Sequence, residues 1–278
     1  MLSRSLCLVH AHPDDESITT GGVIARARDD GHRVVVVTCT AGEEGEVHNL
    51  ADPPRGDRLG EVRLEELRAA CGILGVDRLE LLGYRDSGMA GTPANDHPRS
   101  FHRACLDEAA SLLARVLREE RPDVVVTYTP DGTYLHPDHV KAHLVTVAAL
   151  ALLEREGWRP ARVFWHAIPR SAVERSRERM AERDGGVHPA MGAVGVPDGE
   201  ITTEVDVRGQ LRRKRAAVAA HVTQVPPDDL DAMVGHVMDA MGGFEHFVLA
   251  GGHRAGRAGG DLFAGLAAPR STAIRASV

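Results

Sequence analysis

Two His-Pro-Asp turns, each placed directly after a short apolar segment, constrain this chain more than any other feature. The first turn lies in residues 11–16 and follows the apolar run 6–9, while the second lies in residues 134–139 and follows the run 124–128. Short, β-favouring apolar runs are typical of interior strands of a parallel sheet. Because functional groups gather at the carboxyl ends of such strands, we expect the two turns to converge.

The residue types in these turns indicate a metal site. His12 and Asp15 are three residues apart, so an imidazole and a carboxylate can reach one divalent ion, and Pro13 biases His12 toward an extended backbone. An acidic residue in this turn can equally well cap the following helix. The second turn supplies a further histidine, and two histidines with one carboxylate and open positions for water are typical of a catalytic metal centre.

The alternation of strand and helix signals predicts an α/β fold, a Rossmann-like, doubly wound and mostly parallel sheet with a smaller C-terminal α+β portion. We expect a Rossmann-like, metal-binding core to span residues 1–170, residues 171–250 to complete the same domain, and residues 251–278 to form a flexible tail. The predicted strands are 6–9, 33–40, 79–82, 124–128, 163–165 and 201–207, with a last helix and strand in 229–250. The predicted helices are 23–30, 60–75, a long helix between 106 and Pro122, 140–154, 174–183 and 208–222, with loops at 52–60 and 184–199.

Composition excludes several classes of partner. The chain has 278 residues, 43% of them hydrophobic, a net charge of −7 and a pI of about 6.1, which argues against nucleic-acid binding. We recognise neither a signal peptide nor an apolar run of membrane-spanning length. We therefore expect a cytoplasmic protein that acts on a small molecule, without nucleic-acid or membrane partners, and the sequence leaves open whether it forms a homo-oligomer.

Four stretches of the sequence, residues 9–17, 38–47, 85–92 and 136–139, together resemble a known family. They are similar to the zinc-dependent N-acetylglucosaminyl deacetylases of the LmbE-like or PIG-L superfamily, and most of all to its mycothiol-pathway branch, which acts on N-acetylglucosaminyl-inositol. The resemblance covers roughly the first 150 residues. It implies a metal-dependent hydrolase that removes an N-acetyl group from an aminosugar-containing small molecule by metal-activated water.

The resemblance also implies roles for individual residues. The metal would be Zn²⁺, although the same donors accommodate Fe²⁺, and its ligands would be His12, Asp15 and His139. Asp14 would be the general base, which is free to collect a proton because it is not a ligand.

Further residues would stabilise the tetrahedral intermediate or bind the sugar. A protonated His136, held by Asp138, would face the developing oxyanion, and Tyr134 would hydrogen-bond the same oxygen. Sugar recognition would involve residues on neighbouring strand-end loops, namely Glu46, Arg63 and Asp86. Arg63 can also be interpreted as a solvated helix residue.

Three other histidines fit structural roles better than catalytic ones. His143 lies one helical turn after His139 and can share its face, but three ligands already suffice. His10 lies within a strand and is expected to support the site from behind. His221 belongs to a His-x-x-Gln turn for which we expect a structural role.

The sequence departs from the family pattern before the second turn, where Thr133 and Leu135 replace glycines that are common in relatives and affect the loop that carries Tyr134. Thr19 occupies the position of a lysine in the mycothiol S-conjugate amidases, which favours the deacetylase branch over that alternative. A catalytically inactive sugar-binding module is a second alternative, disfavoured by the intact ligand set and spare carboxylate. A Rossmann dehydrogenase is excluded because the first strand lacks a GxGxxG turn.

Overall fold

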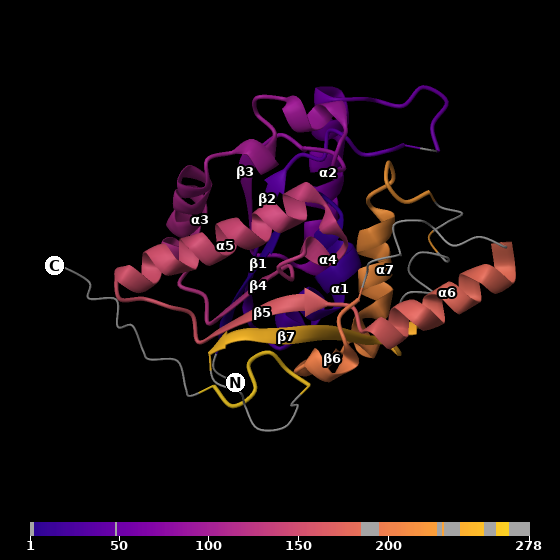
Figure 1. Ribbon diagram of the computed structural model, residues 1–278. Helices are drawn as coiled ribbons and strands as arrows, with labels where there is room; N and C mark the ends of the chain where they lie inside the picture. The colour runs from indigo at the N-terminus through magenta and orange to yellow at the C-terminus, as the bar shows by residue number, and fades with distance from the viewer. Residues whose placement is uncertain are drawn as a thin grey trace.

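A seven-stranded sheet forms the centre of the computed structural model, which describes residues 3–47, 49–184, 195–226, 230, 240–252 and 260–266. The strands are β1 Ser5–His10, β2 Arg33–Thr40, β3 Arg78–Tyr84, β4 Val124–Thr127, β5 Arg162–Ala167, β6 Thr203–Asp206 and β7 Phe244–Gly252. Their order is β3-β2-β1-β4-β5-β7-β6; the first five strands are parallel, and β7 is antiparallel to both β5 and β6 (Figure 1). This confirms the predicted α/β fold.

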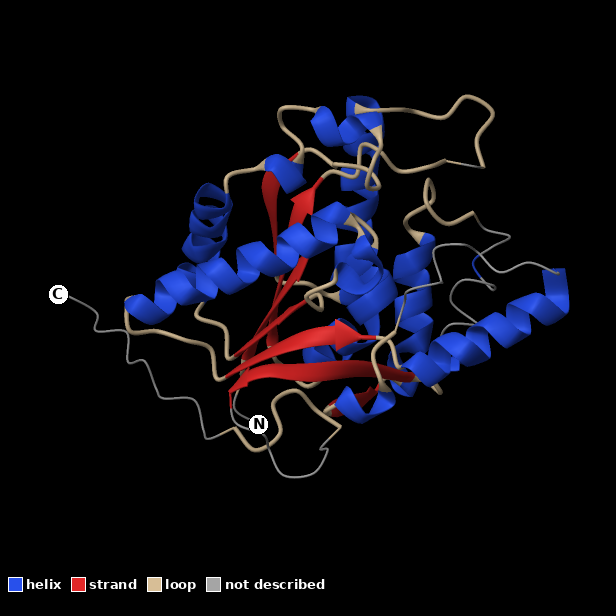
Figure 2. Cartoon of the chain, viewed as in Figure 1, coloured by secondary structure: helices blue, strands red, loops and turns tan. Residues whose placement is uncertain are grey.

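Helices cover both faces of the sheet, as the strands and helices of Figure 2 show. The helices are α1 Asp15–Asp29, α2 Asp57–Leu74, α3 Leu106–Glu120, α4 Gly132–Leu135, α5 Pro137–Arg155, α6 Arg170–Asp184 and α7 Leu211–Ala219. Leu6 and Leu8 of β1 pack into one apolar core with α1, α2 and α7, whereas Cys7 and Val9 pack into a second core with α3 and α5. Burial on both sides explains why β1, β2 and β4 are almost continuously apolar.

The neighbouring strands β1 and β4 determine where the functional loops meet. The strand order reverses between them, because β2 and β3 extend the sheet beyond β1 while β5 extends it beyond β4. In such sheets the crevice at the carboxyl ends of the two central strands is the common ligand site. The turns at residues 11–16 and 134–139 follow β1 and β4 and meet there, as predicted.

Helix α1 begins at Asp15, whereas the sequence predicts a helix from Val23. Gly21 and Gly22 indicate a break in the sequence pattern, yet they lie inside the helix. A Cβ atom on Gly22 would lie within 2.8 Å of the side chains of Val207 and Glu245, so glycine is needed there for close packing. The two oxygens of the Glu245 carboxylate accept hydrogen bonds from the backbone N–H groups of Gly22 and Val23, each at 2.8 Å.

The C-terminal region completes the same sheet, and part of the expected tail is ordered against it. Within the range 251–278, expected to form a flexible tail, Gly251 and Gly252 belong to β7, and Leu262 and Phe263 are buried. The Arg162 guanidinium donates a hydrogen bond of 2.8 Å to the Leu262 carbonyl, a long-range contact that composition does not reveal. Most of the predicted helix after residue 229 lies outside the described residues.

None of the helices in the described part of the chain combines the length and the apolar character that crossing a bilayer requires.

Candidate metal centre

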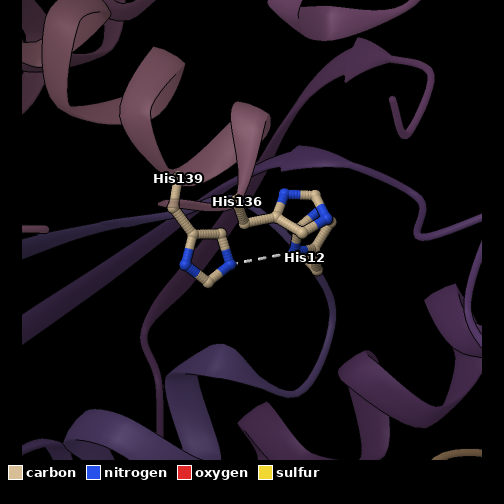
Figure 3. Close-up of side chains that lie close together, drawn as sticks. All are labelled: His12, His136 and His139. Carbon is tan, nitrogen blue, oxygen red and sulfur yellow. Dashed lines mark hydrogen bonds between the residues drawn. The ribbon is translucent and has the colours of Figure 1, made fainter. Parts of the chain in front are cut away.

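Three side-chain atoms from the two His-Pro-Asp turns form a compact triangle. His12 Nδ1 lies 3.2 Å from His139 Nε2, and each of these nitrogens lies 3.5 Å from Asp15 Oδ2. Figure 3 shows the imidazoles of His12 and His139 turned toward each other, with His136 beside them. In a tetrahedral site with bonds of about 2.0–2.1 Å, neighbouring ligand atoms are about 3.3 Å apart. The triangle therefore fits a tetrahedral divalent ion.

The second ring nitrogen of each of the two histidines in the triangle already has a hydrogen-bond acceptor. His12 Nε2 lies 3.3 Å from the Asp138 carboxylate, and His139 Nδ1 lies 3.1 Å from the Gly132 carbonyl. Each acceptor fixes the tautomer in which the other nitrogen presents its lone pair to the triangle.

Two further groups of donors lie close enough to share an ion, namely His12 with His136 and His139, and His12 with Asp86 and Asp138.

Tyr128 supports two of the candidate ligands. Its hydroxyl donates a hydrogen bond of 2.6 Å to Asp15 Oδ2 and accepts one of 2.7 Å from the Ala11 N–H, and its ring stacks on His139 at 4.2 Å. Burial and the Asp15 charge raise the pKa of Tyr128 well above its usual value, so the phenol remains a donor. Sequence reasoning identifies Tyr128 only as a strand residue; its position directly after an apolar strand is the signal that could have found it.

Asp14 lies beside the triangle, and its carboxylate is not one of the three converging groups. Arg63 Nη2 donates a hydrogen bond of 3.1 Å to Asp14 Oδ2. Burial raises the pKa of Asp14 to about 6, and the Arg63 charge limits the increase. A carboxyl group with such a pKa can accept and return a proton near neutral pH.

Arg63 makes several contacts within the protein itself. Its guanidinium is buried and also donates hydrogen bonds to the carbonyls of Pro13 and Gly42, at 2.6 and 2.7 Å. Arg63 follows Leu59 by four residues on the buried face of α2, which explains why it points inward. These contacts connect Arg63 to Asp14 and to the turn before it, and a contact with sugar hydroxyls stays a prediction.

Asp138 and His136 are arranged differently from the prediction. The Asp138 carboxylate accepts hydrogen bonds from the Ser87 N–H, at 2.8 Å, and from the Ser87 hydroxyl, and it faces His12 rather than His136. His136 Nδ1 instead accepts the Asp138 backbone N–H at 3.2 Å and caps α5, which begins at Pro137. Burial and neighbouring histidines lower the pKa of His136 to about 3, which favours a neutral ring over the predicted protonated one.

Tyr134 lies in the short helix α4, whose backbone is uncommon. Its ring packs against His139 at 4.8 Å, which places it beside the triangle. Gly132, Thr133 and Leu135 have φ angles of 64°, 73° and 66°. The segment thus has the positive φ angles that suit glycine, although the side chains of Thr133 and Leu135 disfavour them.

The predicted sugar-binding carboxylates differ in accessibility. Asp86 is buried, accepts hydrogen bonds from the N–H groups of Gly88 and Glu44 at 2.8 and 3.3 Å, and lies 3.5 Å from His12 Nε2. The neighbouring His12 holds the pKa of Asp86 well below its usual value against the effect of burial. Glu46 is exposed and lines a cavity of about 350 Å³ together with Glu43 and neighbouring residues up to Leu59.

The three histidines for which we expect structural roles lie outside the triangle. His143 Nδ1 pairs with the Tyr128 carbonyl at 2.9 Å, and His10 Nε2 lies 3.0 Å from the Thr20 hydroxyl. His221 Nε2 lies 2.8 Å from Glu16 Oε1.

Comparisons with known proteins find relatives over most of the length of the chain. The family model described as PIG-L, GlcNAc-PI de-N-acetylase, matches residues 7–150. The 1D-myo-inositol 2-acetamido-2-deoxy-alpha-D-glucopyranoside deacetylase of Salinispora arenicola is 44% identical over 282 residues, which cover 95% of this chain and 92% of that protein. The enzyme of the same name from Thermobispora bispora is 46% identical over 245 residues, covering 81% and 80% of the two chains.

Solved structures show the same fold. The N,N'-diacetylchitobiose deacetylase from Pyrococcus horikoshii superposes with a TM-score of 0.61 at 21% identity and covers 89% of this chain and 84% of its own. A conserved protein from Thermus thermophilus has a TM-score of 0.59 at 27% identity, with coverages of 91% and 96%. Because the family model matches more than half of the chain and the relatives align over most of its length, the protein belongs to the PIG-L family of GlcNAc-PI de-N-acetylases.

Proposed function

We propose that this protein is a metal-dependent hydrolase that removes the acetyl group from an N-acetylglucosaminyl-containing small molecule, with N-acetylglucosaminyl-inositol as the first candidate substrate. One observation carries the proposal: His12, Asp15 and His139 converge within 3.5 Å while the Asp14 carboxylate remains outside the ligand set. A pure binding module needs neither the triad nor the spare carboxylate. The two relatives described above carry this activity in their names.

The donor set suits Zn²⁺ and also Fe²⁺. When bound, such an ion polarises the amide carbonyl and lowers the pKa of water. Asp14 then accepts the proton from the attacking water and passes it to the leaving amine, so that acetate and a free aminosugar are formed. Arg63 holds the Asp14 carboxylate in place for both transfers.

His136 and Tyr134 are proposed to stabilise the developing oxyanion. Because His136 Nδ1 accepts the Asp138 N–H, the neutral ring carries its own proton on Nε2 and can donate it as a hydrogen bond. A neutral donor is sufficient for this task, since oxyanion stabilisation requires a positioned N–H or O–H rather than a full charge. Tyr134, whose pKa burial raises, remains a phenol that can also donate.

The sugar and its aglycone are proposed to lie toward the loop at residues 42–47. Glu46 is exposed there beside a cavity, and its carboxylate can accept hydrogen bonds from sugar or polyol hydroxyls. Asp86 lies deeper, close to His12, and would contact only the part of the sugar nearest the reacting amide.

The experiment is amine release from N-acetylglucosaminyl-inositol by protein of known metal content, with N-acetylglucosamine and a mycothiol S-conjugate assayed in parallel. Asp14→Asn should retain the metal and lose about 10²–10⁴-fold in turnover, whereas His139→Ala should lose both. If Asp14→Asn emptied the site instead, the ligand and base assignments would be exchanged. Hydrolysis of the S-conjugate alone would identify an amidase, and absence of turnover with sugar still bound would favour the binding module.

A further inference from the structure

The backbone of Asp14 is itself unusual. Asp14 has φ 114° and ψ −32° and immediately precedes α1. Few residues other than glycine adopt a positive φ, and such a conformation persists only where surrounding contacts hold it in place. The residue proposed as general base therefore depends on contacts that fix its main chain, in addition to the Arg63 contact that fixes its carboxylate.

Glu16 supplies such a contact. Its Oε2 accepts the backbone N–H of Asp14 at 3.0 Å, and its Oε1 accepts the Ser17 hydroxyl at 2.5 Å. Glu16 is fully buried, so its carboxylate has no access to water that could replace these partners. The orientation of this carboxylate consequently determines whether the Asp14 N–H is paired.

His221 reaches the same carboxylate from the C-terminal part of the chain. Its Nε2 lies 2.8 Å from Glu16 Oε1, and both side chains are fully buried. The turn that carries His221 follows α7 and is fixed independently, because the N–H and hydroxyl of Thr223 donate hydrogen bonds of 2.8 and 2.7 Å to Glu66 of α2. His221 is therefore held against Glu16 by its own turn.

We propose that Glu16 and His221 are positioning residues that keep Asp14 in its left-handed backbone conformation and so direct its carboxylate at the substrate amide. The inference rests on the proposed function, in which Asp14 is the general base. It assigns to the His-x-x-Gln turn, which lies beyond the matched family segment, a task in the active site. Without His221, the buried Glu16 carboxylate loses a partner and rotates, and Asp14 relaxes to an ordinary negative φ.

The test compares three variants of the metal-loaded full-length protein. His221→Ala should lower kcat about 10–100-fold with KM and metal content unchanged, since a displacement of about 1 Å at a catalytic group can cost 10²-fold. His221→Gln can still donate an N–H to Glu16 and should recover part of kcat. Val222→Ala is the matched control: it shortens an exposed side chain of the same turn that takes part in none of these hydrogen bonds, and should leave kcat unchanged.

A double-mutant cycle separates positioning from a general structural role. If His221 acts through Asp14, His221→Ala should cause no further loss when added to Asp14→Asn. An equal loss in both backgrounds, or loss of the metal from His221→Ala, would overturn the proposal.

Crystal structures test it without any activity measurement. They should show φ of residue 14 positive in the wild type and negative in His221→Ala; an unchanged positive φ in the variant would refute the inference. This readout also separates two failures. A wild-type protein inactive on every acetamide would refute the proposed function, while the φ comparison would still decide the role of His221.

Discussion

Removal of the Tyr128 hydroxyl is the sharpest test of how the metal centre is supported. Tyr128→Phe keeps the ring that stacks on His139 but deletes the hydroxyl that bonds both Asp15 Oδ2, at 2.6 Å, and the Ala11 N–H, at 2.7 Å. Tyr128 is fully buried, so water cannot replace the lost atom without rearrangement. The substitution therefore acts on one candidate ligand, Asp15, through a single oxygen.

The lost contacts should lower two separate quantities, the free energy of unfolding and the affinity for the metal. In the metal-free protein the Ala11 N–H loses its acceptor and Asp15 loses a donor, while the bond of 2.9 Å from the His12 N–H to Asp15 remains. Leaving such groups unpaired should lower the free energy of unfolding by about 2–4 kcal/mol. Loss of a partner that orients a ligand typically weakens metal binding by about 10–100-fold, equivalent to about 1.4–2.7 kcal/mol. The metal-loaded protein should lose the sum of both.

Two assays separate the contributions. Competition with a chelating dye gives the Zn²⁺ affinity, and urea denaturation with and without a chelator gives the free energies of unfolding. Tyr84→Phe is the control, because Tyr84 is the last residue of β3 and its ring packs against Phe101. Wild-type Zn²⁺ affinity in Tyr128→Phe would refute the reasoning, even if stability fell.

Three other predictions address the remainder of the structure. Lys214→Met deprives the buried Glu245 carboxylate of the cation 2.6 Å away and should lower the free energy of unfolding by about 3–5 kcal/mol in urea, with partial recovery when Glu245→Gln is added. Thr133→Gly and Leu135→Gly relieve φ angles of 73° and 66°, and each should stabilise the protein by about 0.5–1 kcal/mol in calorimetry; a decrease would show that side-chain contacts outweigh backbone strain. Burial lowers the pKa of His166 to about 3. The unfolded His166 has a pKa of about 6.5, so between pH 3 and pH 6.5 the unfolded chain binds one proton more than the folded chain. The free energy of unfolding should therefore fall by up to about 1.4 kcal/mol for each pH unit of acidification in this range. His166→Phe should reduce this slope in metal-free protein.

The sequence was sufficient to predict that the two His-Pro-Asp turns meet. Both His-Pro-Asp turns follow apolar strands, and the topology of a parallel sheet brings such strand ends together whatever their separation along the chain. The convergence of His12, Asp15 and His139 follows from this rule. The fold class could also be predicted, because the spacing of apolar residues indicates which faces of the helices and strands are buried.

The contacts around the ligands could not be predicted, because they depend on side chains that are distant in sequence. The resemblance pairs Asp138 with His136, yet the Asp138 carboxylate bonds Ser87, which lies 51 residues earlier. For Arg63 the sequence allows a solvated residue or a sugar ligand, because its direction depends on the rotation of α2 about its axis. Local patterns contain no information about such pairings, which tertiary packing decides.

The orientation of the candidate ligands also depends on the C-terminal region, which lies outside the segment that the family model matches. Asp15 lies in the first turn of α1, so any movement of that helix moves a candidate ligand. The position of α1 is fixed by Glu245, which bonds the N–H groups of Gly22 and Val23 and is itself held by Lys214 of α7. The matched segment, residues 7–150, therefore contributes the donor atoms, but their relative orientation depends on β7 and α7, which lie outside it.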